Sequence, residues 1–302
     1  MSARKLIRVA AAQYPIDQLQ TMDAARDKIA RWVGEAASRG AELLVFPEYG
    51  AMELSAIRGV QVAADVPASL EAVSELLGEI DALHVELARR HGVYILAASG
   101  PSRRADLPYV NAARLASPTG QIGAQEKRIM TPFEREWGIV GGQHQRVFDT
   151  SLGRIGIAVC YDSEFPLLVR AQAEAGADLI LIPSCTERVS GAHRVRTAAL
   201  ARALENGCAT ILSPTVGDAP WCLTVDHNEG IGGIYVPAEA RVSKTGVLAE
   251  GRLSEPGWIF ADIDLGALED LRTTGEMRNA NDWNAQPGAA PLAHHVDVID
   301  LG

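Results

Sequence analysis

Three residues with reactive side chains each stand at the end of an expected strand. Cys160 ends the run RIGIAV, Glu48 follows LLVFP, and Lys127 follows QIGAQE. A carboxylate can accept the proton of a thiol, and an ammonium group beside a cysteine favours the thiolate and stabilises a developing oxyanion. Together these groups could carry out nucleophilic hydrolysis, provided that the fold brings them together.

Cys160 has the local context of a nucleophile, although a cysteine in a strand usually serves only packing. It follows the strand IGIAV and precedes a turn, and a helix is expected to begin near Phe165-Pro166. A strand–turn–helix corner of this kind exposes a nucleophile and offers free backbone N–H groups. Cys185, in IPSCT, ends the equivalent strand of a second unit and is the rival nucleophile.

Glu48 and Lys127 also have ordinary explanations. Directly after a buried strand and a proline, Glu48 would be partly desolvated, which would raise its pKa toward the range of a general base. It could equally be a surface residue that caps a loop. Lysines at strand ends often serve solubility, so Lys127 gains a chemical role only through proximity to the thiol.

Other kinds of reactive site have little support in the sequence. The seven histidines form no HxxxH or HxH pair and the four cysteines no CxxC pair, so we expect no metal. The segment GIGGIY lacks the strand-to-helix context of a phosphate loop, and no GxSxG nominates a serine. We therefore expect catalysis without a cofactor.

The composition is that of a globular protein with a sizeable core. Of the 302 residues, 47% are hydrophobic and 22% are charged, and the formal net charge of −10 comes from dispersed acidic residues. This charge argues against nucleic acid and anionic membranes as partners, because neither surface attracts an acidic protein. No stretch approaches the length of a membrane span. We expect reduced cysteines and a cytoplasmic location.

Two similar segments are expected to build the scaffold. Residues 40–47 read GAELLVFP and residues 176–183 read GADLILIP. Each follows a helical pattern, and each of those helices follows an apolar strand, IRVAAAQ or RIGIAV. Long strands buried on both faces need a covering layer on each side. The pattern therefore predicts an α/β fold with two sheets packed face to face and helices outside.

The chain shows no linker or second composition regime. We therefore expect one domain over residues 1–276. Residues 277–302, rich in Asn, Ala, Pro and Gly, are expected to form a C-terminal extension that packs on a partner subunit.

Taken together, the motifs FPEYG, EKRIMTPFE and GRIGIAVCYDSEFP resemble those of the nitrilase superfamily of carbon–nitrogen hydrolases, in the family's order. The likeness spans roughly residues 7–265 and implies a four-layer α-β-β-α sandwich. It implies that Glu48 is the general base, Lys127 the cation on the oxyanion side and Cys160 the nucleophile. The backbone N–H of Tyr161 would be a second oxyanion donor.

The resemblance also implies a second glutamate downstream of the lysine, which is Glu134 or, as the alternative, Glu136. The Tyr-Asp after the cysteine resembles the amidase and carbamoylase branches more than the Trp-Glu of true nitrilases. The implied activity is hydrolysis of a small linear amide to a carboxylic acid and ammonia through a thioester. Nitriles and N-carbamoyl compounds are the alternative substrates, and a silent binding protein is the alternative class. A homodimer or higher homo-oligomer is implied as well.

Overall fold

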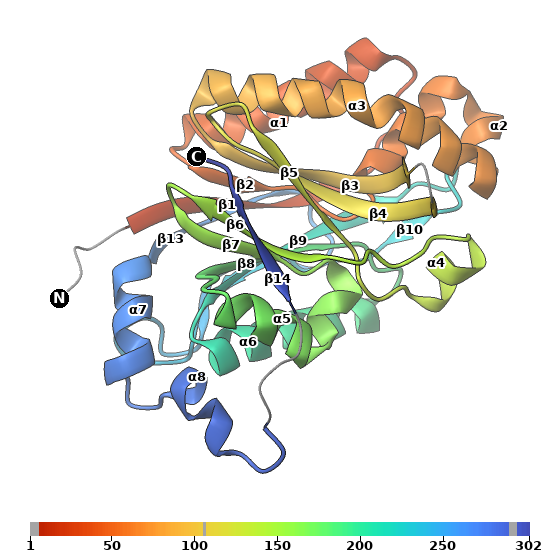
Figure 1. Cartoon of the computed structure of the whole chain (residues 1–302). Helices are drawn as coiled ribbons and strands as arrows, with labels where there is room; N and C mark the ends of the chain where they lie inside the picture. The colour runs from red at the N-terminus through yellow and green to blue at the C-terminus, as the bar shows by residue number, and fades with distance from the viewer. Residues whose placement is uncertain (1–5, 105–106, 290–294) are drawn as a thin grey trace.

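The structure, a computed structural model of the chain, describes residues 6–104, 107–289 and 295–302. The strands form two sheets that pack against each other, with helices on the outer face of each (Figure 1). The predicted four-layer α-β-β-α sandwich is confirmed.

The first sheet contains the strands of the first sequence unit, and antiparallel strands lie on either side of them. Its strand order is β13 (Gly257–Asp264), β1 (Leu6–Pro15), β2 (Leu43–Val45), β3 (Tyr94–Arg104), β4 (Leu107–Ala116) and β5 (Ile122–Glu126). Strand β2 runs parallel to both β1 and β3, with Leu43 opposite Val9 and Tyr94.

The second sheet contains the second sequence unit. Its strand order is β14 (Val296–Asp300), β6 (Gln145–Thr150), β7 (Gly153–Ile157), β8 (Leu179–Ser184), β9 (Ala209–Asp218), β11 (Gly233–Tyr235) and β12 (Val247–Glu250), and β10 (His227–Asn228) pairs with β9. Strand β8 runs parallel to both β7 and β9, as β2 does in the first sheet.

The two units repeat the same hydrogen bonds, and those to the side chains explain the recurring acidic residue. Glu42 N–H donates to Arg8 O at 2.8 Å, and Arg8 N–H donates to Glu42 Oε1 at 3.1 Å. In the second unit Asp178 N–H donates to Arg154 O at 2.9 Å, and Arg154 N–H donates to Asp178 Oδ2 at 3.4 Å. In each unit the acidic residue stands just before the middle strand. Glu48 and Cys185 therefore lie beyond the ends of corresponding strands, one in each sheet.

Helices and 3₁₀ turns connect many of the strands. They are α1 (Met22–Ser38), α2 (Val60–Ala63), α3 (Val66–His91), α4 (Pro132–Glu136), α5 (Pro166–Glu174), α6 (Val189–Asn206), α7 (Leu265–Thr274) and α8 (Asn279–Asp282), with 3₁₀ turns η1 (Gly50–Arg58), η2 (Cys160–Glu164) and η3 (Trp283–Ala285). Helices α1 and α3 cover the first sheet, and α5 and α6 cover the second (Figure 1).

Capping residues account for the limits of the long helices. The side chain of Thr21 accepts a hydrogen bond from Ala24 N–H at the start of α1, and Asp65 accepts one from Ala68 N–H at the start of α3. Helix α3 ends at Gly92, whose φ of 67° favours glycine. Strand β2 has only three residues and is shorter than the sequence suggests, because Pro47 has no N–H with which to continue the ladder.

The two sheets are joined where β1 ends. There Tyr14 and Pro15 pair in parallel with Thr215 and Val216 of β9. Inward-facing residues such as Val9, Leu43 and Leu181 fill the space between the sheets, while a second apolar cluster lies under α1 and α3. This packing brings the ends of β2 and β8 to the same region of the molecule.

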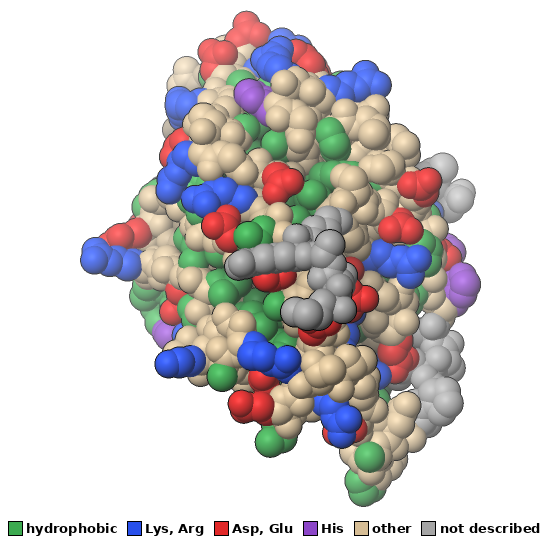
Figure 2. All heavy atoms as spheres, turned by 90° about the vertical axis from the view of Figure 1, so that its left-hand side faces the viewer, with side chains coloured by type: hydrophobic (Ala, Val, Ile, Leu, Met, Phe, Trp, Pro, Cys, Tyr) green, Lys and Arg blue, Asp and Glu red, His purple; other side chains and the backbone are tan. Residues whose placement is uncertain are grey.

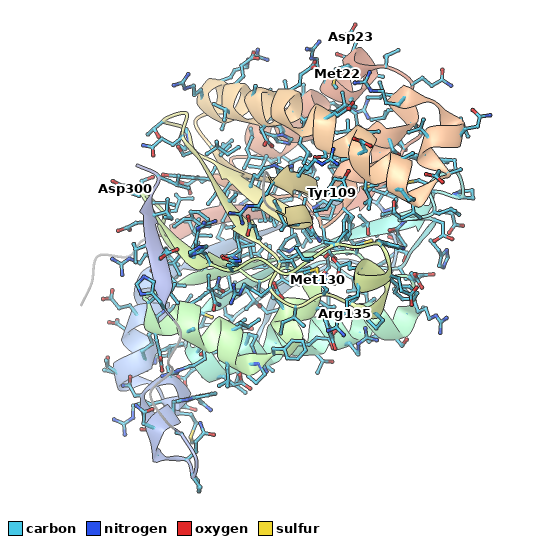
Figure 3. The ribbon with its side chains drawn as sticks, turned by 45° about the vertical axis from the view of Figure 1, so that its right-hand side comes forward. Met22, Asp23, Tyr109, Met130, Arg135 and Asp300 are labelled. Carbon is cyan, nitrogen blue, oxygen red and sulfur yellow. The ribbon has the colours of Figure 1, made fainter. Side chains whose placement is uncertain are left out.

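Part of the predicted C-terminal extension is a strand of the second sheet. Strand β14 pairs in parallel with β6, with Val298 opposite Val147. Leu301 is buried in the core between the sheets, and Leu301 N–H donates to Asp149 O at 3.0 Å. Asp300 lies on the opposite side of the molecule from α4 (Figure 3). Contact of this segment with a partner subunit stays a prediction.

Acidic and basic side chains are interspersed on the face shown in Figure 2. Among the helices of the described residues, none is long and apolar enough to cross a membrane.

The substitution Leu301→Ala tests how much β14 contributes to the fold. Removal of a buried leucine side chain should lower the free energy of unfolding by about 2 kcal/mol or more. Val298→Ala is the matched control on the same strand, because Val298 is 50% exposed, and it should change stability by less than about 0.5 kcal/mol. Urea unfolding measures both, and equal effects would show that β14 is not docked as described.

Candidate active site

Glu48 enters the interior through a tight turn at the end of β2. Ser99 N–H, on the neighbouring strand β3, donates to Pro47 O at 3.0 Å. Tyr49 adopts a left-handed φ of 52°, and its N–H donates to Ser99 Oγ at 3.1 Å. The turn leaves Glu48 only 1% exposed.

Cys160 lies at the predicted strand–turn–helix corner. Strand β7 ends at Ile157, and Ala158 N–H still donates to Leu181 O of β8 at 2.9 Å. Cys160 then takes a φ of 48° and begins η2. A left-handed conformation is uncommon for a residue with a side chain, and such residues cluster at functional sites.

Lys127 directly follows β5 and is held by contacts with β4 and η2. Its backbone N–H donates to Asn111 O at 2.8 Å. The next two N–H groups, of Arg128 and Ile129, donate to the carboxyl group of Asp162 at 3.0 and 2.8 Å. Asp162 thus joins the loop after Lys127 to the turn that begins at Cys160.

Glu134 is oriented by the start of the short helix α4. The helix begins with a capping box, in which Glu134 N–H donates to Thr131 Oγ1 and Thr131 N–H donates to Glu134 Oε2. This geometry turns the Glu134 side chain back into the protein, whereas Glu136 is exposed. Figure 3 shows this region, with Met130 before α4, Arg135 on it and Tyr109 on nearby β4.

The structure brings the predicted charged residues together. The Nζ atom of Lys127 lies 2.7 Å from Glu48 Oε1 and 2.7 Å from Glu134 Oε2, and Lys127 is 1% exposed. Of the two alternatives for the second glutamate, Glu134 makes this contact.

The backbone of Cys185 links the base to the thiol. Cys185 N–H donates to Glu48 Oε2 at 3.0 Å, while Cys160 Sγ lies 3.7 Å from Cys185 O and donates to it. The Cys185 thiol donates to Asn228 Oδ1 at 3.4 Å. The predicted rival nucleophile therefore lies beside Cys160, and its backbone contacts both Glu48 and Cys160.

The two glutamates differ in proton affinity. Burial raises the pKa of Glu48 above its ordinary value, although Lys127 acts against this. Burial would also raise the pKa of Glu134, but the charge and hydrogen bond of Lys127, with donors from Thr131 and Tyr49, lower it. Divergent pKa values distinguish a base from a permanently ionised partner, so Glu48 is the better proton acceptor.

The pKa values of Lys127 and Cys160 are also shifted. Burial would lower the pKa of Lys127, but the two carboxylates raise it well above its usual value. Burial and the charge of Glu48 raise the pKa of the Cys160 thiol well above its usual range. At neutral pH the sulfur of Cys160 is therefore a thiol in the free protein.

These groups open onto a cavity of about 640 Å³, a size suited to a small organic molecule. Phe133, Trp137 and Tyr161 provide apolar lining, and Glu187 and Arg188 provide charge. Tyr161 is the second residue of η2, and the first N–H groups of such a helix have no acceptor within it. Within the described ranges, no group of three His, Cys, Asp or Glu residues is arranged to hold a metal.

The sequence interpretation missed three residues of this site. Asn111 Nδ2 donates to Glu48 Oε1 at 2.9 Å, and Tyr49 O–H donates to Glu134 Oε1 at 2.8 Å. Thr131, the third, belongs to the motif Thr-Pro-Phe-Glu, a capping-box pattern that would have favoured Glu134 over Glu136. No local signal identifies Asn111, which is one polar residue in a strand.

Alkylation tests the assignment of the thiol. Iodoacetamide should modify Cys160 before the other cysteines, because Glu48 beside it can take up the thiol proton. The rate should rise continuously from pH 6 to 9, since the pKa of the Cys160 thiol is raised. The Cys185 thiol donates to the amide oxygen of Asn228, which cannot take up its proton, so Cys185 should react slowly. Peptide mapping by mass spectrometry measures both, and modification of Cys185 with Cys160 intact would contradict the assignment.

Asp162 should make stability depend on pH. Burial raises its pKa to about 7, so the folded state favours the protonated carboxyl. This contribution is complete below the ordinary pKa near 4 and is lost as pH rises through 7, at about 1.4 kcal/mol per pKa unit. Asp162→Asn should therefore gain stability relative to the unaltered protein between pH 5 and 8. Thermal unfolding of both proteins at each of the two pH values measures the difference in stability between them. The same difference at both pH values would contradict the raised pKa of Asp162.

Comparisons with known proteins agree with this architecture. A model of the carbon-nitrogen hydrolase family matches residues 8–273. The probable hydrolase YhcX of Bacillus subtilis (strain 168) is 31% identical over 277 residues, which cover 91% of this chain and 53% of YhcX. The chain thus spans about half the length of that relative.

Two solved structures extend the likeness to three dimensions. A carbon-nitrogen hydrolase from Helicobacter pylori G27 matches with a TM-score of 0.73 and 21% identity, covering 89% of this chain and 92% of that one. A mutant of the amidase from Nesterenkonia sp. AN1 matches with a TM-score of 0.63 and 25% identity, covering 88% and 96%. With the family match over most of its length, the chain belongs to the carbon–nitrogen hydrolase family, within the nitrilase superfamily.

Proposed function

We propose that this chain is a cysteine-dependent amidase that converts a small linear carboxamide into a carboxylic acid and ammonia. The observation that carries the proposal is the buried Lys127 ammonium group, which bridges Glu48 and Glu134 at the wall of the cavity that contains Cys160. The Nesterenkonia protein supports the amide class, because it is an amidase with an active-site cysteine.

The first step is attack by the thiol. Glu48 Oε1 already accepts hydrogen bonds from Lys127 and Asn111, whereas Oε2 accepts one from Cys185 N–H. Oε2 is therefore the oxygen that takes the proton of Cys160. The sulfur bonds to the amide carbon as the carbonyl π electrons move to oxygen, which gives a tetrahedral oxyanion.

Lys127 is suited to hold this oxyanion. Its ammonium group has three N–H donors, and two of them point to Glu48 and Glu134. The third, with the backbone N–H of Tyr161, is available for the substrate oxygen. A donor in such a position is typically worth about 3 kcal/mol of barrier.

The second half returns the enzyme to its starting state. The C–N bond breaks, and the protonated Glu48 gives its proton to the departing ammonia, leaving a thioester on Cys160. Glu48 then accepts a proton from a water molecule that attacks the thioester carbon. The C–S bond breaks, the thiol recovers its proton from Glu48, and the carboxylic acid leaves.

Ammonia release from a panel of amides, nitriles and N-carbamoyl compounds tests the proposal. We expect turnover of small linear amides, and Glu48→Gln should lower kcat by about 100-fold or more because the base is lost. Glu136→Gln is the matched control, since Glu136 is exposed, and should change kcat less than twofold. Turnover of nitriles or carbamoyl compounds alone would reassign the substrate, and no turnover with any of them would favour a binding protein.

A further inference from the structure

Asn111 lies behind the proposed catalytic groups. It is fully buried on β4, on the same side of the strand as Ala113 and Leu115, which pack between the two sheets. Among the described residues, it is not part of the lining of the catalytic cavity. Any effect of Asn111 on the reaction must therefore pass through the residues that it contacts.

Those contacts reach all three charged residues. Asn111 Nδ2 donates to Glu48 Oε1 at 2.9 Å and to Glu134 Oε1 at 3.3 Å. Its backbone oxygen accepts from Lys127 N–H at 2.8 Å. One buried amide thus lies between the two carboxylates and also anchors the backbone of the lysine that bridges them.

Ser99 fixes the orientation of this amide. Ser99 Oγ accepts a hydrogen bond from Tyr49 N–H at 3.1 Å, so its own proton is available to the Asn111 side-chain oxygen, 2.7 Å away. With Oδ1 held in this way, the NH₂ group must face the carboxylates. The backbone of Tyr49, which follows Glu48, is therefore part of the same chain of hydrogen bonds.

The excess of negative charge at the site explains why a side-chain amide is placed beside the two carboxylates. Two carboxylates face one ammonium group, so one negative charge is left over in a buried site. Donors directed at a carboxylate favour its charged form. We propose that Asn111, fixed by Ser99, is a positioning residue that keeps Glu48 ionised next to the ionised Glu134, so that Glu48 can accept the proton of Cys160. The role in turnover rests on the proposed function.

Other titratable groups face the same carboxylates from neighbouring elements and contribute to their titration. They are Lys127 after β5, Tyr49 before η1, Cys160 and Asp162 on η2, and Cys185 after β8. All of these side chains are retained in variants of Asn111, so those variants isolate the amide, whereas Ser99→Ala also removes the acceptor of Tyr49 N–H.

The test compares Asn111→Ala, the isosteric Asn111→Asp and Ser99→Ala with the unaltered protein. In the pH profile of kcat/KM, we expect the acid limb of Asn111→Ala to lie about one pH unit higher than that of the unaltered protein. The shift should be larger for Asn111→Asp, which faces two carboxylates with a third, and smaller for Ser99→Ala. The variants should lower kcat and change KM less than about threefold, because Asn111 does not line the cavity.

Asn206→Ala is the control. Asn206 is another buried asparagine, whose Nδ2 donates to Arg202 O on α6, so its loss should leave the pH profile unchanged. Profiles of the Asn111 variants that match this control would overturn the proposal. If both Asn111 variants fail to fold by circular dichroism, an unchanged profile of Ser99→Ala overturns it.

A second measurement does not depend on turnover. Carbon-13 NMR of protein labelled at the glutamate carboxyl carbon, assigned with Glu48→Gln, follows the protonation of Glu48. The midpoint should rise in the Asn111 variants, and an equal midpoint in all proteins would overturn the positioning role. Absence of turnover in the unaltered protein would instead overturn the proposed function, while leaving this titration to decide the role of Asn111.

Discussion

The ammonium group of Lys127 is buried between two carboxylates, and the rest of the site is arranged around that contact. An isolated buried charge is costly, and removal of one partner of a buried ion pair leaves such a charge behind. Two carboxylates compensate Lys127 but leave one negative charge in excess. The neutral donors Asn111, Tyr49 and Thr131 all point at these carboxylates, as this excess requires.

The same contact explains why two similar carboxylates behave differently. Glu134 belongs to a capping box and accepts further hydrogen bonds from Tyr49 and Lys127, which favour its charged form. Glu48 has an oxygen with a single backbone donor, directed toward the end of β8. A base and a fixed counterion therefore arise from one residue type because their local backbone structures differ.

The sequence was sufficient to predict what depends on local pattern. The repeated Gly-Ala-acid segments predicted the paired units, and the hydrogen bonds that the Glu42 and Asp178 side chains accept from Arg8 and Arg154 N–H show why an acidic residue recurs. Strand ends predicted the positions of Glu48, Lys127 and Cys160. Asn111 could not be found in this way, because its role comes from β4 lying beside Glu48, a contact between residues 63 positions apart. The docking of the segment after residue 295 also depends on distant contacts.

The Cys185 peptide contacts both Glu48, which follows the first sheet, and Cys160, which follows β7 of the second. Neither sheet contains both the base and the nucleophile, so neither unit of the repeat is a smaller version of the site. Bond cleavage then requires the two sheets to be packed face to face in the correct register. A change anywhere in the shared core that lets the sheets slide apart would separate base from thiol while each sheet kept its own hydrogen bonds. The reaction rate would thus report the relative position of the two halves more sensitively than secondary-structure content does.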